Sequence, residues 1–149
     1  VTLHDYCLQD PLQWKKPGLV FVNSMSDLFH EDVPLHFIQE VFCVMNEASW
    51  HVFQILTKRS KRLLEVATEL NWTPNIWQGV TVESQKYIER IEHLRQVPAN
   101  VKFISFEPLI GEIRDINLNG IDWVIVGGRK WSKVQGNEGG MGFILKGNM

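Results

Sequence analysis

Polar side chains that could bind a ligand or exchange protons recur directly after short apolar runs of this chain. The densest group contains Asn23, Ser24 and Asp27, with His30 three residues further on. In a functional interpretation, Asp27 and the neighbouring amide and hydroxyl groups hold a ligand, and His30 acts as an acid or base. In the alternative interpretation, the same residue types only satisfy free backbone groups at the junction between a loop and a helix.

A basic cluster follows the second apolar run, where Lys58, Arg59, Lys61 and Arg62 lie within five residues. Such a cluster could receive a phosphate or carboxylate, because cations and free N–H groups at a helix start both favour anions. Lys58 lies next to the apolar run, so we expect it to point into a site and hold an anionic group. Lys61 and Arg62 are expected on a solvated helix face.

Two carboxylates and one hydroxyl follow the third and fourth apolar runs. Glu83 comes shortly after the third run, and Ser105 and Glu107 come after the fourth. Paired carboxylates can perform acid–base chemistry or bind a cation or amine. The alternative is that each carboxylate caps the next element, which suits Glu83 better than Glu107, because Pro108 favours an extended turn over a helix start.

The elements that must position these side chains are five short β-branched runs, at residues 19–22, 52–56, 76–80, 101–104 and 123–126. Their low alternation is typical of strands that are buried on both faces in a parallel sheet. Ligands of such sheets bind at the carboxyl ends of the strands. We therefore expect Asp27, Lys58, Glu83 and Glu107 to converge in one cleft.

Helical periodicity follows three of these runs. The pattern predicts a helix that begins near Pro34 with Asp32 as its cap, and two further helices over residues 60–70 and 84–96. The segment 109–121 is too short and too rich in turn residues for a crossover helix. The first eighteen residues are expected to be irregular.

The predicted fold class is α/β, as an incomplete (β/α) TIM-like barrel or an open parallel sheet of about five strands with helices outside. Closure into eight strands needs roughly 200 residues or more, and the chain has 149. Residues 1–128 are predicted to form the partial barrel domain, and residues 129–149 a Gly-rich tail that is flexible or covers a sheet edge. Because an unclosed sheet has an unpaired edge, we expect a homo-oligomer.

Composition restricts the classes of function. The net charge of −2 does not indicate nucleic-acid binding, and no apolar run approaches the ~20 residues of a membrane span. The two cysteines, Cys7 and Cys43, have neither disulfide nor metal-ligand spacing, so no metal site is predicted. A cytoplasmic location is expected.

Five ordered motifs resemble those of a known family. They occupy residues 22–34, 53–59, 79–85, 106–109 and 121–128. In this order they resemble a phage-associated family of unknown function, found in bacteria and their mobile elements and similar to radical S-adenosylmethionine enzymes. The resemblance implies a partial β/α barrel.

For full-length members, the resemblance also implies a cysteine cluster that holds an iron–sulfur centre and S-adenosylmethionine. This chain departs from that pattern, because Cys7 and Cys43 stand alone and an iron–sulfur cluster needs several thiolates close together. We therefore expect no cofactor in this chain. It also departs after Gly128, where the family usually continues Glu-Ser-Gly. The chain is expected to be a core segment of the family.

The predicted function is that of a truncated radical-SAM-like barrel segment, not catalytic alone, whose polar strand-end cleft binds a small polar or anionic ligand. Asp27 and Glu107 would hold cationic or hydroxyl groups. Two alternatives stay open: an interaction or oligomerisation module from a mobile element, and a metal-independent acid–base enzyme that uses the strand-end carboxylates. No catalytic residue is assigned, and the candidate ligand-binding residues are Asn23, Ser24, Asp27, Lys58, Glu83, Ser105 and Glu107.

Overall fold

Parallel strands in chain order form one sheet in the computed structural model, which describes residues 7–22, 26–126 and 142–143. The order runs β1 to β6 without a reversal, and all neighbouring pairs are parallel. The bounds are β1 (Leu19–Val22), β2 (Val52–Thr57), β3 (Ile76–Thr81), β4 (Val101–Phe106), β5 (Trp123–Val126) and the two-residue β6 (Gly142–Phe143). The prediction of an open α/β sheet of about five parallel strands is confirmed.

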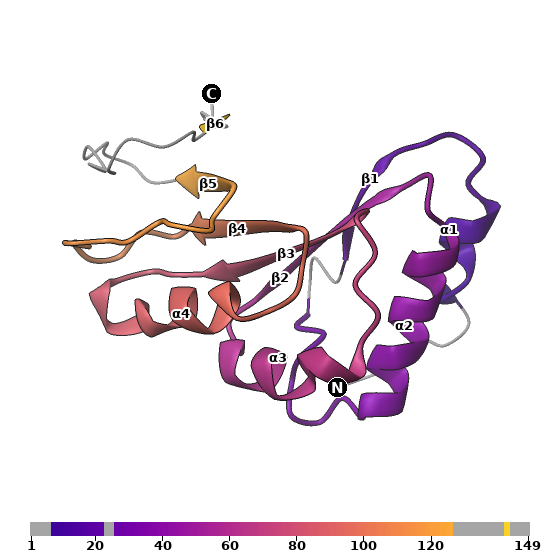
Figure 1. Cartoon of the computed structure of the whole chain (residues 1–149), viewed down its shortest axis with the longest axis horizontal. Helices are drawn as coiled ribbons and strands as arrows, with labels where there is room; N and C mark the ends of the chain where they lie inside the picture. The colour runs from indigo at the N-terminus through magenta and orange to yellow at the C-terminus, as the bar shows by residue number, and fades with distance from the viewer. Residues whose placement is uncertain (1–6, 23–25, 127–141, 144–149) are drawn as a thin grey trace.

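The main helices lie on one face of this sheet, as Figure 1 shows. They are α2 (Leu35–Glu47), α3 (Ser60–Val66) and α4 (Glu89–Arg95), each placed between two consecutive strands. A doubly wound sheet has a reversal of strand order and helices on both faces. The sheet described here therefore winds like part of a β/α barrel, and its first and last strands do not pair to close it.

The N-terminal segment and two helix ends differ from the predictions. A short helix α1 (Asp10–Gln13), with Pro at its start, occupies a segment that was expected to be irregular. Pro is tolerated there because the first N–H groups of a helix have no internal partner. The predicted helices 60–70 and 84–96 contain 3-10 turns, η2 (Ala67–Glu69) and η3 (Gln85–Tyr87). Between β4 and β5 the described chain has no helix, as predicted.

The predicted cap of α2 is wrong. This helix has no side-chain cap, and the residue at its N-cap position is Pro34. The backbone N–H of Asp32 instead donates to His30 Nδ1 at 3.1 Å, within the preceding turn. Because two residues separate Asp32 from the first residue of α2, the Asp32 carboxylate comes too early in the chain to cap this helix.

The hydrophobic core lies between the helices and the sheet. It contains large side chains from both layers, including Ile38, Phe42, Phe53, Ile55, Leu63, Ile76, Ile91, Leu94 and Ile104. Burial of these side chains, at about 25 cal/mol per Å² of apolar surface, is the main force that holds the helices on this face.

The opposite face of the sheet is buried unevenly. Phe103 stacks on Trp123 with ring centroids 4.3 Å apart, and its ring also covers Gly79, where a Cβ would collide with it. On the edge strand β1, by contrast, Leu19 is 63% exposed and Phe21 is 43% exposed. The expectation of burial on both faces is therefore wrong for β1, because no described element covers its second face.

None of the helices in the described ranges is both long and apolar enough to cross a membrane.

Candidate functional site

Asp27 joins the segment after β1 to the turn after β2. Its Oδ1 atom accepts hydrogen bonds from the Phe29 N–H at 3.0 Å and the Thr57 hydroxyl at 2.7 Å. Its Oδ2 atom accepts one from the Lys58 N–H at 3.1 Å and lies 3.5 Å from Arg59 Nη1. A carboxylate has about four acceptor positions, so the protein itself occupies those of Asp27.

The local sequence explains why the turn after β2 has a fixed shape. Thr57 is the last residue of β2, and its Oγ1 atom accepts a hydrogen bond from the Arg59 N–H at 2.9 Å. Thr hydroxyls commonly bond to the backbone two residues on, which holds such turns in place. The chain then enters α3 at Ser60, and Lys58 is directed along the carboxyl edge of the sheet.

Glu83 lies between two cations at the carboxyl end of β3. Its Oε1 atom is 2.6 Å from Lys58 Nζ, and its Oε2 atom accepts a hydrogen bond from Arg90 Nη1 at 2.9 Å. Arg90 also donates to the Thr81 carbonyl at 2.7 Å, and its guanidinium lies 4.2 Å from the centre of the Tyr87 ring. The Glu83 side chain is only 8% exposed.

Burial and the two cations act in opposite directions on the pKa of Glu83. Burial raises this pKa, but the hydrogen bond from Lys58, a backbone hydrogen bond and the charges of Lys58 and Arg90 together lower it below its ordinary value. Glu83 therefore stays ionised near neutral pH, and its negative charge is compensated within the protein.

We define the strand-end cluster as Asp27, Lys58, Arg59, Glu83 and Arg90. Three of these side chains are cations and two are carboxylates, and a further carboxylate, the exposed Glu31, lies 4.0 Å from Arg59 Nε, so the charges around the cluster are balanced. Lys58 is the most accessible of the cations, because its side chain is 52% exposed, against 33% for Arg59 and 13% for Arg90. Its ammonium group has three N–H donors, so it can contact a further acceptor besides Glu83.

The structure brings together three of the predicted candidates, Asp27, Lys58 and Glu83. Ser105 is buried at the end of β4, where its carbonyl accepts the Val82 N–H at 2.9 Å. Glu107 is exposed, and its carboxylate makes no ion pair or hydrogen bond within the described part of the chain. Asn23 and Ser24 lie outside the described residues.

Sequence reasoning missed Arg90 and assigned no role to Arg59. Arg90 belongs to α4, seven residues after Glu83, and nothing in that spacing distinguishes it from other surface cations. Arg59 was noted only as part of the basic cluster. His30 takes part in neither the Arg90–Glu83 nor the Arg59–Asp27 contact. Its Nδ1 atom accepts a hydrogen bond from the Asp32 N–H and is 3.6 Å from the Asp32 carboxylate.

The described residues contain no group of three or more His, Cys, Asp or Glu side chains that could hold a metal ion. In comparisons with known proteins, the model of a family described as Protein of unknown function (DUF5131) matches residues 1–137. No curated protein and no solved structure matches the chain.

Proposed function

The chain belongs to this DUF5131 family, and from the geometry of the chain itself we propose that it is a binding domain for a small anionic ligand. The ligand binds at the strand-end cluster, next to Lys58. The observation that carries the proposal is the exposed Lys58 ammonium, which has N–H donors beyond the one that faces Glu83.

Three features support an anion as the ligand. Glu83 is already compensated by Lys58 and Arg90, so it repels an arriving anion less than an unpaired carboxylate would. The cluster lies at the carboxyl ends of β2 and β3, the edge at which ligands of parallel sheets bind. A phosphate or carboxylate would form a charge-assisted hydrogen bond with Lys58, stronger than a neutral one.

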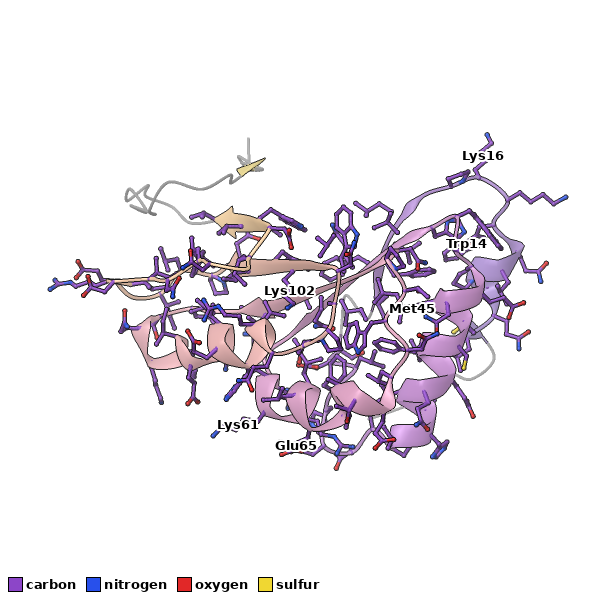
Figure 2. All side chains as sticks on the ribbon, in the orientation of Figure 1. Trp14, Lys16, Met45, Lys61, Glu65 and Lys102 are labelled. Carbon is purple, nitrogen blue, oxygen red and sulfur yellow. The ribbon has the colours of Figure 1, made fainter. Side chains whose placement is uncertain are left out.

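The test is a calorimetric titration with pyrophosphate at low ionic strength, where charges are screened weakly. We expect Lys58→Ala to weaken binding about fivefold or more, because it removes a charged donor. The matched control is Lys61→Ala. Lys61 lies at the outer surface of α3 (Figure 2), and its Nζ atom is 4.0 Å from Glu89 Oε1. Its loss should leave the affinity within about twofold. Absence of binding by the unmodified chain, or equal effects of the two variants, would refute the proposal.

The same contacts argue against acid–base catalysis by Asp27 and Glu83. A general acid or base works best when its pKa lies near the working pH. Glu83 has a lowered pKa, and all acceptor positions of Asp27 are engaged. The contacts of Glu83 therefore keep its carboxylate ionised, and those of Asp27 occupy its acceptor positions, which suits the binding of a charged ligand better than proton transfer.

A second proposal is self-association through β1. In the described residues, β1 pairs only with β2, and it exposes Leu19 and Phe21 on its uncovered face. Exposed apolar strand edges are commonly covered by another chain. Light scattering over a dilution series should show a dimer or larger species that Phe21→Lys dissociates. The control Ile110→Lys changes an apolar residue away from β1 that is 71% exposed, more than Phe21. A monomer at every micromolar concentration would exclude the interface.

A relation to radical S-adenosylmethionine enzymes is likewise proposed, and the barrel-like winding of β1–β5 supports it. The residues of this chain do not fit an iron–sulfur cluster. Cys43 is exposed on α2, and together with Cys7 it supplies two thiols where a cluster needs several thiolates close together. No reaction step is therefore derived through such a cluster.

A further inference from the structure

A cavity of about 380 Å³ lies between β1, α1 and α2. Its volume falls in the range of small-molecule sites, about 300–1,000 Å³. Most of its wall is apolar: Val22 and Phe53 come from the sheet, and Phe37, Val41 and Met45 come from α2. Figure 2 labels Met45 on α2 and Trp14 on the segment after α1, which contributes the remaining aromatic wall.

The charged residues that line this cavity are both acidic. They are Asp10, in the first turn of α1, and Asp27, and among the described residues no Lys, Arg or His lines it. Asp27 is partly compensated by Arg59 at 3.5 Å. Asp10 is exposed, and its carboxylate has no ion pair or hydrogen bond among the residues described. The charged groups that the described residues contribute to the cavity wall are therefore carboxylates.

We propose that this cavity binds a small organic cation, in which an ammonium group is attached to a compact apolar body. The apolar body fills the space against Phe37, Val41 and Phe53, where its burial removes hydrocarbon surface from water. The ammonium group is attracted by Asp10, whose carboxylate has no ion pair among the described residues, and the Trp14 ring in the cavity wall offers a further favourable contact for a cation. An anion of the same shape is disfavoured by both carboxylates.

This site is distinct from the anion site proposed above. The two share Asp27, but neither Lys58 nor Arg90 lines the cavity. The sign of the preferred ligand charge is opposite at the two sites. Each site can therefore be tested by a variant that leaves the other site unchanged, Lys58→Ala for the anion site and Asp10→Asn for the cavity.

Three probes of one shape separate the contributions of charge and apolar burial: benzylamine, benzyl alcohol and benzoate. Binding to the full chain is followed by NMR of ¹³C-methyl methionine, because the buried Met45 side chain lines the cavity. The Met45→Leu variant assigns its signal. We expect a saturable shift of that signal, with benzylamine bound about threefold to tenfold more tightly than benzyl alcohol. Benzoate should bind most weakly.

Two variants and one control complete the test. Asp10→Asn should reduce the affinity for benzylamine about threefold and leave that for benzyl alcohol unchanged. The control Glu47→Gln removes the same charge from an exposed position of α2 outside the cavity, and should change neither affinity. Val44→Phe places a larger side chain in the cavity, so it should weaken the binding of all three probes. No saturable shift with any probe, binding of benzoate as tight as that of benzylamine, or an Asp10→Asn variant with unchanged preference would overturn the proposal.

Discussion

Replacing Asp27 tests whether its carboxylate fixes the carboxyl edge of the sheet. Three of its hydrogen bonds are well formed, to the Phe29 N–H, the Thr57 hydroxyl and the Lys58 N–H, at 3.0, 2.7 and 3.1 Å. The side chain is 16% exposed. Its removal leaves two backbone N–H groups and one hydroxyl without their acceptor, next to the fully buried Phe29.

The expected cost follows from these three bonds. A net contribution of about 1–1.5 kcal/mol each gives about 3–5 kcal/mol of lost unfolding free energy for Asp27→Ala. Asp27→Asn keeps the Oδ1 acceptor but faces the Lys58 N–H with an amide donor. It therefore loses one of the three bonds and should cost about 1–1.5 kcal/mol on the same scale. The Arg59 contact, at 3.5 Å, adds little to either value.

Urea denaturation followed by circular dichroism measures these changes through the transition midpoint. In a thermal melt of a chain of this size, the same loss of about 3–5 kcal/mol would lower the melting temperature by roughly 6–20 °C. The matched control is Asp32→Ala, at an exposed carboxylate five residues further on, which should cost less than about 0.5 kcal/mol. A cost below about 1 kcal/mol for Asp27→Ala, or no difference from Asp32→Ala, would refute the reasoning.

Three further predictions concern other parts of the molecule. The pKa of Glu83 is lower in the folded state than in the unfolded state, so its ionised carboxylate stabilises the fold above the unfolded pKa, and this stabilisation is lost as pH falls through the folded pKa. In denaturation measured over a pH series, Glu83→Gln should therefore reduce the fall of the unfolding free energy at acidic pH. Gly79→Ala should cost about 1–3 kcal/mol in thermal melts, because a Cβ collides with the Phe103 ring, whereas Gly18→Ala, with its nearest neighbour 3.8 Å away, should be tolerated. Anaerobic reconstitution with iron and sulfide should yield no stoichiometric cluster, and charge-transfer absorption with matching iron content would contradict this.

The positions of the strands could be predicted from sequence because each is a short β-branched run. The runs 19–22 and 123–126 match β1 and β5 in full, whereas β2, β3 and β4 extend one or two residues further. The added residues include the polar Thr57, Thr81 and Ser105. Their pairing depends on the neighbouring strands, as in the register Thr81 with Ser105, and that information is not local.

Helix starts were less predictable for a related reason. The periodicity that places α2 depends on its apolar face and is visible in sequence. The choice between Asp32 and Pro34 at its start depends on how the preceding turn folds on His30. Likewise α1 is too short to show a period, and it contacts α2 in the folded chain.

By itself, the sequence determined that polar residues follow the strands of a parallel sheet, which was enough to place Asp27, Lys58 and Glu83 among seven candidates. Only the tertiary structure decided what these side chains do, because Arg90 reaches Glu83 from α4 and the turn after β2 surrounds Asp27 with donors. The acidic cavity beneath α1 was equally invisible, since its walls come from residues 7 to 53. The physical reason is the same for both: ion pairs and cavities depend on distances between elements, which hydrophobic periodicity does not encode.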